Sequence, residues 1–288
     1  SLKTQAQTFV STTPENKNVI LEEFTGIYCQ FCPDGHLIAQ GLHNANPNDV
    51  FLINIHTGGY SNPNSPNDPD FNCSYGSAIA NNANIAGYPA GSVNRAIFSG
   101  ITPQNPGGTA MSRSDWATAA SDIISQPSYV NVGIQASYDM ATGLLTVNTE
   151  TYYTSTTTNI NVLHVAVVQN NVPGPQTGAS SFNPGAIITG PWNPTYNHQH
   201  MFRHLMDGAN GLEFTTTTAG TFIPNTHTWQ MPANLSNGQQ TNGFFPNLDP
   251  TNLDVVAYIA EGPGEIITGF QSTVTPIFPN AYDANVTN

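Results

Sequence analysis

The first half of the chain alternates apolar runs with segments of helical spacing. The runs NVILEEFTG (18–26) and DVFLINIH (49–56) have the length and apolar content of buried strands. Between them, DGHLIAQGLHNA (34–45) places its apolar side chains near helical spacing, and small residues predict a second helix at 75–85. The order strand, helix, strand, loop and helix is that of a βαβ unit, so we expect an α/β fold here.

The second half of the chain has a different pattern. A helix predicted at 114–125 is terminated by Pro127, and beyond it short segments alternate polar and apolar positions. The runs YVNVGIQASY, GLLTVNTETYY and INVLHVAVVQN predict an antiparallel meander, and LDVVAYIAEGPGEIITGFQSTV predicts a hairpin around a Gly-Pro-Gly turn. We therefore expect two domains, an α/β domain at 1–127 and an all-β sandwich at 128–288.

The composition narrows the classes of partner. Lys and Arg number 5 against 18 Asp and Glu, a formal net charge of -13, so we expect no nucleic-acid partner. Only 8% of the residues are charged, and uncharged polar residues dominate instead, as is typical of loop-rich β proteins outside the cytoplasm. No stretch approaches the roughly 18 apolar residues of a membrane helix, so we expect an exported chain that has lost its signal peptide and has no transmembrane segment.

The strongest chemical signal is the sequence CQFC, which follows a predicted strand and opens a predicted helix. Unpaired N–H groups at a helix N-terminus favour a thiolate, so Cys29 is the candidate nucleophile. Cys32, one turn further on, would resolve the mixed disulfide. Two alternatives stay open: a disulfide that forms once during export and stays closed, and a metal clip that includes His36. The metal clip lacks a fourth ligand, so we expect no metal.

Three other features of the sequence are candidate redox or metal sites. Cys73 is an odd third thiol, either an inert buried cysteine or a third redox partner of the pair. The stretch PTYNHQHMFRHLMDG holds His198, His200 and His204, of which the last two would share a face if the stretch were helical. Imidazoles that form hydrogen bonds between strands are the favoured interpretation. The insert SNPNSPNDPD (61–70) offers oxygen donors, but it favours a surface loop that overhangs the cysteine pair over a calcium site.

The segment VILEEFTGIYCQFCP resembles the active-site segment of thioredoxin-like proteins, and YPAGSVNR resembles their loop that carries a cis-proline. This resemblance implies that Glu23 accepts the proton of Cys32. It also implies that Pro89 faces the cysteine pair with a cis peptide after Tyr88. Tyr88 and Phe31 are the candidate substrate contacts at that rim. These roles follow from the resemblance and not from spacing.

A wider resemblance covers nearly the whole chain. The motifs LEEFTG.YC..CP, YP.G.VNR and Y.H.HMFR...MDG together resemble a Bacteroidota family of outer membrane and surface proteins of the 28-kDa type. It implies export to the periplasm or cell surface, an α/β thioredoxin-like N-terminal domain and an all-β immunoglobulin-like sandwich. It implies much less about activity.

Two functions from different classes follow. The first is a thiol-disulfide oxidoreductase that acts on exported proteins through Cys29 and Cys32, with no cofactor. The second is a non-catalytic surface protein, in binding, adhesion or assembly, that uses the thioredoxin-like fold as a scaffold with a structural disulfide. Exposed strand edges would then pair with neighbouring copies or with a surface partner.

Overall fold

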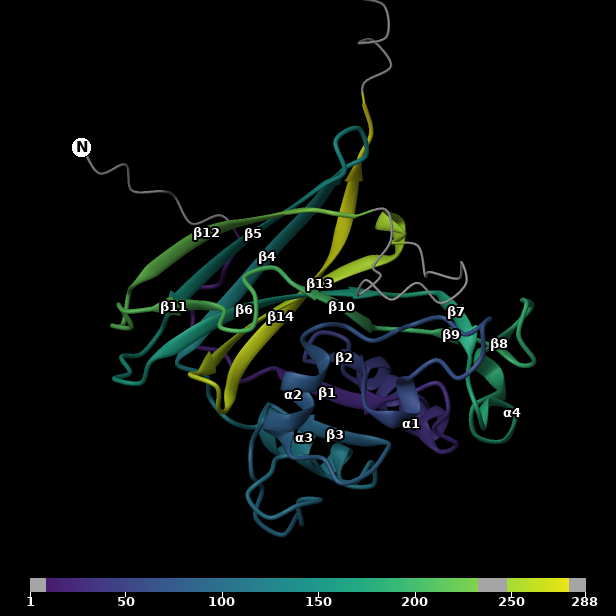
Figure 1. The fold of residues 1–288 in the computed structure, drawn as a ribbon. Helices are drawn as coiled ribbons and strands as arrows, with labels where there is room; N and C mark the ends of the chain where they lie inside the picture. Colours follow the sequence, from purple (N-terminus) through teal and green to yellow (C-terminus); the bar gives the residue numbers. More distant parts are fainter. Residues whose placement is uncertain (1–8, 233–247, 280–288) are drawn as a thin grey trace, which may run out of the picture.

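A computed structural model describes residues 9–232 and 248–279 of the chain, and these residues are mostly β structure with few helices (Figure 1). The strands are β1 (Val19–Thr25), β2 (Val50–His56), β3 (Ala90–Val93), β4 (Val130–Asp139), β5 (Leu144–Tyr153), β6 (Asn161–Gln169), β7 (Val172–Pro175), β8 (Ile187–Ile188), β9 (Thr195–His198), β10 (Met201–Leu205), β11 (Leu212–Phe214), β12 (Phe222–Gln230), β13 (Leu253–Glu261) and β14 (Ile266–Ile277). The helices are α1 (Cys32–Ala45), α2 (Gly76–Ala83), α3 (Trp116–Ile124) and α4 (Ala179–Phe182), with 3-10 turns η1 (Gly59–Ser61), η2 (Pro184–Ala186) and η3 (Pro250–Asn252).

One large mixed sheet runs through both halves of the chain. It is 11-stranded, in the order β12-β5-β4-β14-β13-β6-β10-β2-β1-β3, with β11 paired to β6. Strand β10 of the second half joins β2 of the first, where the N–H of Asn54 donates to the carbonyl of His200 at 2.8 Å. A separate three-stranded sheet, β7-β9-β8, lies beside α1 and α4. The hydrogen-bonded network is therefore continuous across residue 127.

Most of the predicted elements form. Strands β1 and β2 are parallel with α1 between them, and β3 is antiparallel to β1. The β13–β14 hairpin and the β4–β5 hairpin are also confirmed. The predicted meander is wrong at its third strand, because β6 pairs with β13 and β10 and leaves β12 beside β5. The reason is that every residue of β6 is buried, which requires a central position rather than one on a half-solvated edge.

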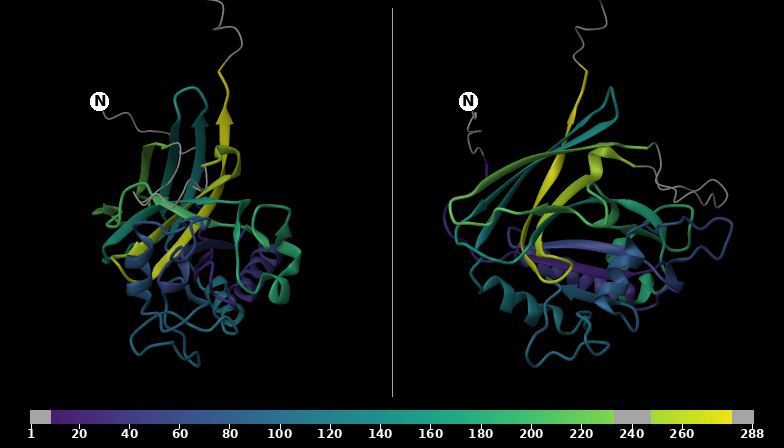
Figure 2. Two further views of the ribbon diagram at one scale, coloured as in Figure 1. Left: turned by 45° about the vertical axis from the view of Figure 1, so that its right-hand side comes forward. Right: turned by 60° about the vertical axis from the view of Figure 1, so that its left-hand side comes forward.

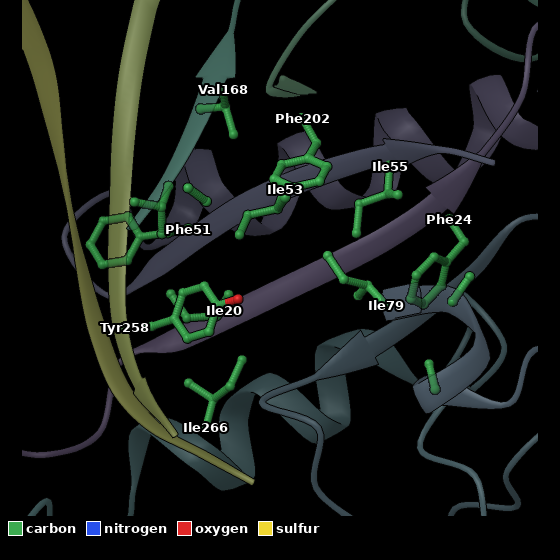
Figure 3. Close-up of a cluster of buried hydrophobic side chains, with 14 of the residues drawn as sticks. Ile20, Phe24, Phe51, Ile53, Ile55, Ile79, Val168, Phe202, Tyr258 and Ile266 are labelled. Atoms are coloured by element: carbon green, nitrogen blue, oxygen red, sulfur yellow. The ribbon is translucent and has the colours of Figure 1, made fainter. Parts of the chain in front are cut away.

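Strands β6 and β13 separate two hydrophobic cores. Val168 and Tyr258 face a core shared with β1, β2 and α2, part of which Figure 3 shows. Their neighbours Val167 and Ala257 face a second core, shared with β4, β5 and β14. Strand β14 leaves β13 and continues along β4 from Val274, so β4 and β5 rise away from the helices (Figure 2). Both faces of one strand pair are thereby withdrawn from water.

The motif VNR ties β1 to the hairpin of the second half. The side chain of Asn94 accepts a hydrogen bond from the N–H of Ile20 and donates to the carbonyls of Asn18 and Ile266. Arg95 binds Glu22 through two N–H···O contacts of 2.9 and 2.5 Å and donates to the hydroxyl of Tyr258. Asn94 and Arg95 both have left-handed backbone angles, φ 49° and 50°.

The Asn94 side chain is therefore expected to be a large contributor to stability. Asn94→Ala leaves one buried N–H and two carbonyls without this partner, so the free energy of unfolding should fall by roughly 3 kcal/mol or more. Asn84 is a matched control, because it also has a positive φ of 57° but is exposed. Asn84→Ala should cost about 1 kcal/mol or less. Urea unfolding of both variants measures the difference, and equal losses would contradict the assigned role.

Candidate functional site

The two cysteines lie where β1 meets α1. Strand β1 ends at Thr25, a turn carries Cys29, and Cys32 is the first residue of α1. Their sulfurs form a disulfide, and the two Cα atoms are 5.4 Å apart. Pro33 follows in the first helical turn, where its missing N–H has no cost. The helix N-terminus predicted for this motif is therefore in place.

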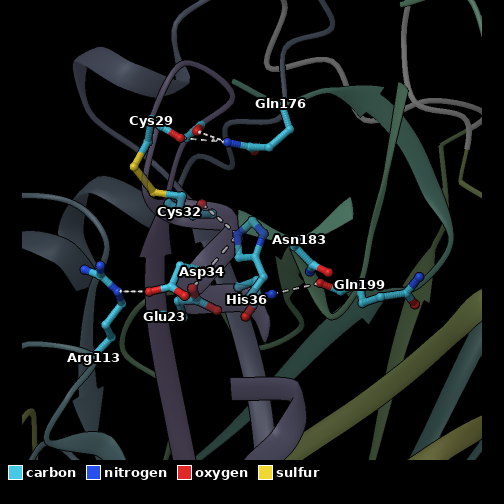
Figure 4. A network of polar contacts seen from close by, with 12 residues as sticks. Glu23, Cys29, Cys32, Asp34, His36, Arg113, Gln176, Asn183 and Gln199 are labelled. Carbon is cyan, nitrogen blue, oxygen red and sulfur yellow. Dashed lines mark hydrogen bonds and ion pairs between the residues drawn. A yellow bond between two sulfur atoms is a disulfide. The ribbon is translucent and has the colours of Figure 1, made fainter. Parts of the chain in front are cut away.

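A segment from the second half of the chain covers this disulfide. We call residues 176–182 the cover segment. The side-chain amide of Gln176 donates to the carbonyls of Gly26 and Cys29, at 3.2 and 3.0 Å (Figure 4), and the N–H of Thr177 donates to the carbonyl of Ile27 at 2.8 Å.

The fit of the cover segment is close. Gly178, with φ +79°, lies against the carbonyl of Gln30, where any Cβ would overlap. The ring of Phe182 packs edge-on against Phe31, with ring centres 5.1 Å apart. Beneath these contacts Cys29 is only 3% exposed and Cys32 is fully buried.

Glu23 is a buried carboxylate beneath α1. It is fully buried, and neither carboxyl oxygen has a hydrogen-bond partner in the described part of the chain. Burial raises the pKa of this carboxyl well above its ordinary value. Gly35 lets the helix approach, because a Cβ there would lie 2.6 Å from the Glu23 carboxyl and 3.0 Å from the Pro89 ring. Glu23 and Pro89 therefore both lie against α1 at Gly35. The peptide between Tyr88 and Pro89 is cis, as the resemblance predicted.

His36 connects Glu23 to the second half of the chain. One ring nitrogen is 2.9 Å from the Thr25 hydroxyl and 3.9 Å from the Glu23 carboxyl, and the other is 3.1 Å from the Tyr196 hydroxyl. Asn183 in turn donates to that hydroxyl at 2.8 Å. Burial lowers the pKa of His36 to about 4, so the ring is neutral at pH 7. A neutral His36 therefore adds no positive charge beside the cysteine pair.

The rim of the site holds the two candidate substrate contacts. Phe31 is 46% exposed beside the disulfide, with the Arg113 guanidinium 5.9 Å from its ring centre. Tyr88 is partly buried against Tyr60, ring centres 5.7 Å apart, and burial raises its pKa. Arg113 also pairs with Asp34 at 2.5 Å. The segment that precedes α3 thus brings a positive charge to the first turn of α1.

Cys73 lies on the far side of β2 from the helix that carries the pair. Its thiol is 3.3 Å from the carbonyl of Arg203 and packs against the core shared with β10. Burial raises the pKa of this thiol, which lowers its thiolate fraction at neutral pH. The geometry supports an inert buried cysteine over a third redox partner.

The histidine-rich stretch forms β9 and β10, so the alternative in which His200 and His204 share a helix face is wrong. His198 packs among His56 and Phe71, His200 contacts Gln40, and His204 stacks on a tryptophan ring. These three imidazoles thus lie in separate environments. Among the residues that the structure describes, no group of three His, Cys, Asp or Glu side chains could hold a metal ion.

The insert at 61–70 is tied to the cysteine loop. Asp68 accepts hydrogen bonds from the N–H groups of Asn64 and Ser65 and from the hydroxyl of Tyr28, the residue before Cys29. The insert therefore contacts the residue before Cys29, and its position over the pair itself stays a prediction. Asp68 is buried, so its oxygens serve the loop itself.

Sequence reasoning missed several members of the site. Gln176 and Asn183 come from more than 140 positions further along the chain, in a segment without local chemical signal. Tyr196 lies in the histidine-rich stretch, but its contact with His36 was not predicted. A hydroxyl, imidazole and carboxylate chain also went unnoticed: His227 lies 3.1 Å from the Thr149 hydroxyl and 3.0 Å from Asp207. It resembles a nucleophile with its base, but Thr149 is only 1% exposed between strands, so a substrate has no access to it.

Comparison with solved structures places the fold. HBP35 of Porphyromonas gingivalis shares 18% sequence identity with this chain at a TM-score of 0.63, covering 95% of this chain and 80% of its own. A protein of Agrobacterium tumefaciens has 11% identity and a TM-score of 0.47, with 89% and 94% covered, which is too distant to support a conclusion. No curated protein matches the sequence. Among the described residues, no helix is both long and apolar enough to cross a membrane.

A family model for outer membrane protein Omp28 matches residues 76–271, which is more than half of the chain. The match contains the YPAGSVNR loop and most of the large sheet, but it begins after the cysteine pair. Family membership therefore supports no conclusion about the chemistry of the disulfide. The resemblance predicted from the three motifs is confirmed: the chain belongs to the Omp28 outer membrane protein family and is an extracytoplasmic protein of the outer membrane surface.

Proposed function

We propose that this surface protein exchanges disulfides with exported proteins through Cys29 and Cys32. In this proposal residues 1–127 are a thioredoxin-like unit and residues 128–288 an immunoglobulin-like sandwich, joined through the continuous sheet. The parallel β1–β2 pair, the antiparallel β3 and the cis peptide before Pro89 support the first assignment. The paired hairpins β4–β5 and β13–β14 around a common core support the second.

The observation that carries the proposal is the environment of Glu23. A fully buried carboxyl without a hydrogen bond destabilises the fold, because the group loses its contact with water without compensation. The neighbouring Glu22 is also buried but is paired with Arg95. A purely structural disulfide requires no such acid behind it. A carboxyl with a raised pKa beside a redox pair is, however, suited to accept a thiol proton near neutral pH.

The exchange proceeds in two successive reactions. The Cys29 thiolate attacks one sulfur of a substrate disulfide, forms a mixed disulfide and releases the other substrate sulfur as a thiolate. Cys32 then transfers its proton to the Glu23 carboxylate and attacks the Cys29 sulfur. This restores the Cys29–Cys32 disulfide and releases the second substrate thiolate. Two electrons pass from the protein dithiol to the substrate, and the reverse sequence oxidises a substrate dithiol.

The substrate would reach the pair at the rim formed by Phe31, Tyr88 and Pro89. An extended segment of an exported protein would pair its backbone beside Pro89 and contact the exposed ring of Phe31. Because both sulfurs are buried, the cover segment must first move away from Cys29. Movement of the cover segment would thus control the access of a substrate to the disulfide.

A non-catalytic surface protein is the second candidate, and the burial of both cysteines favours it. In that case the disulfide fixes the turn between β1 and α1, and the Gln176 contacts fix the cover segment onto it. The large sheet ends at β12 and β3, and the backbone of β12 offers an edge for pairing with a partner or a second copy.

The reduction potential of the disulfide separates the two candidates. We expect a value between about -120 and -270 mV, the range of known oxidoreductases. It would be measured in glutathione and dithiothreitol buffers by alkylation and mass spectrometry, on a Cys73→Ser background that leaves one thiol pair. A value below about -300 mV would support the structural disulfide instead.

Glu23→Gln tests the proton acceptor. The variant should slow resolution of a mixed disulfide at Cys29 by tenfold or more at pH 7, as followed by rapid-quench mass spectrometry. The same variant should be more stable than the wild-type protein, although it resolves the mixed disulfide more slowly. Because the folded-state pKa of Glu23 is raised, ionisation destabilises the native protein as pH rises above about 4.5. Glu23→Gln removes that loss and should therefore stabilise the fold at pH 8, as urea unfolding would show.

Glu22→Gln is the matched control, since it changes the adjacent buried acid in the same way. It breaks the ion pair with Arg95 and should destabilise the fold by roughly 3 kcal/mol, without the specific slowing of resolution. Resolution at the wild-type rate in Glu23→Gln would refute the role of Glu23.

Gln176→Ala tests the cover segment. Without the side-chain amide, the carbonyls of Gly26 and Cys29 lose a buried donor, and two hydrogen bonds of about 1 kcal/mol each are lost, so the open state should be roughly thirtyfold more populated. Reduction of the native disulfide by dithiothreitol should accelerate by the same factor. Gln230→Ala is the control, because Gln230 is exposed on β12 and its side-chain amide donates to the carbonyl of Thr142, away from the cysteine pair. Equal reduction rates in the two variants would show that the cover segment does not limit access.

A further inference from the structure

The contacts of His36 determine which of its ring nitrogens carries the proton. Asn183 donates to the Tyr196 hydroxyl at 2.8 Å, and that hydroxyl lies 3.1 Å from Nδ1 of His36. Tyr196 is only 2% exposed, and in the described part of the chain its hydroxyl meets no acceptor other than Nδ1. The hydroxyl therefore donates to Nδ1, and a neutral ring carries its proton on Nε2.

The protonated nitrogen faces the buried acid. Nε2 lies 2.9 Å from the Thr25 hydroxyl and 3.9 Å from Oε1 of Glu23, and Figure 4 shows Glu23 and Asn183 on either side of the His36 ring. Neither carboxyl oxygen of Glu23 has a hydrogen-bond partner among the described residues. A movement of about 1 Å would bring the Nε2–H group into hydrogen-bond distance of this carboxyl.

Helix α1 brings this ring to the cysteine pair. His36 follows Cys32 by four positions, and residues four apart lie on the same side of a helix. Gly35, which precedes His36, is the point where Glu23 lies against α1. One turn of the helix therefore places the imidazole beside the resolving cysteine and its proposed proton acceptor.

We propose that His36 is a positioning residue for the resolving step: when Glu23 ionises, the Nε2–H group of His36 turns from the Thr25 hydroxyl to the carboxylate and stabilises its charge. The proton stays on Nε2, and Tyr196 maintains the tautomer that makes this contact possible. The inference rests on the proposed disulfide exchange, in which Cys32 gives its proton to that carboxylate.

The hydrogen bond would set how much carboxylate is present at neutral pH. Desolvation raises the pKa of Glu23, whereas a donor to the ionised form lowers it. His36 would therefore keep the pKa of Glu23 below the value that burial alone produces. Without this donor, Glu23 would be protonated over a wider range of pH and could not accept the proton of Cys32 there.

The other imidazoles around His36 add no charge at pH 7. Strand β9 contributes Tyr196 and His198 to its surroundings, and β2 contributes His56. Burial lowers the pKa of His198 to about 3 and lowers that of His56 well below its ordinary value, so both rings are neutral. Burial raises the pKa of the Tyr196 hydroxyl, which therefore also stays uncharged. Glu23 is thus the group whose ionisation would engage the Nε2 proton.

Nitrogen NMR of the full chain with labelled histidine tests the tautomer without a change in the site. We expect the His36 ring to be protonated on Nε2 at pH 7, and Tyr196→Phe to produce a mixture of tautomers. Tyr153→Phe is the control, because it removes another buried hydroxyl, bonded to Asn161, and should leave the His36 signal unchanged. A wild-type ring protonated on Nδ1 would overturn the proposal.

Carboxyl carbon NMR of Glu23 measures the coupling in the disulfide form, in which neither cysteine of the pair titrates. His36→Leu should raise the titration midpoint of Glu23 by about one pH unit. His36→Gln keeps an N–H donor and should titrate close to the wild-type protein. His164→Leu removes an imidazole of similar burial on β6, and it should leave the midpoint unchanged. Equal midpoints in His36→Leu and the wild-type protein would refute the coupling.

The pH profile of mixed-disulfide resolution at Cys29 distinguishes this role from the exchange itself. In His36→Leu the profile should move up by about one pH unit and recover the wild-type rate at high pH, whereas a purely structural loss would lower the rate at every pH. If the wild-type protein shows no exchange but the Glu23 midpoint still rises in His36→Leu, the coupling stands and the proposed exchange fails. Exchange with the same profile in both proteins would refute the role of His36.

Discussion

The fold depends on burying both faces of the strand pair β6 and β13. Because neither strand has a polar face, each must lie between two apolar layers, and the chain supplies one layer from each of its halves. This constraint places β10 between β6 and β2, which joins the two halves in one sheet. The connection from β6 to β10 contains the cover segment and, at Asn183 and Tyr196, the hydrogen-bonded groups next to His36 on α1. The site is therefore assembled by the sheet order rather than by the cysteine motif alone.

Two adjacent acids on β1 show how the alternation of a strand separates structural from chemical roles. Glu22 points toward the second half and is neutralised by Arg95, whose guanidinium also reaches Tyr258 on β13. Glu23 points toward α1, where Gly35, Pro89 and the His36 ring approach it and neither carboxyl oxygen has a hydrogen-bond partner among the described residues. Burial is nearly equal for the two acids, and desolvation raises the pKa of the unpaired Glu23. The two roles differ because the partners of the acids differ, not because their depths do.

Sequence reasoning succeeded where the signal was local. The apolar runs predicted β1 and β2, the helical spacing predicted α1, and the motif YPAGSVNR marked the cis peptide before Pro89. It failed where long-range pairing decides the result. The position of β6 depends on strands almost 100 residues later, and Arg113 reaches Asp34 only because α3 packs beside α1. The letters VNR were recognised as a family motif, but their hydrogen bonds to Ile20 and Ile266 required the three-dimensional fold.

Burial of the disulfide and its proposed exchange are compatible once the cost of opening is considered. Three hydrogen bonds hold the cover segment over the cysteine turn, two from the Gln176 amide and one from the Thr177 N–H. At about 1 kcal/mol each, they would allow roughly one molecule in a hundred to be open. Exchange would then be slowed about a hundredfold relative to an exposed pair, but not abolished. Such a cover would protect a surface disulfide from small thiols while leaving it available to a protein partner that binds at Phe31 and displaces Phe182 from that ring.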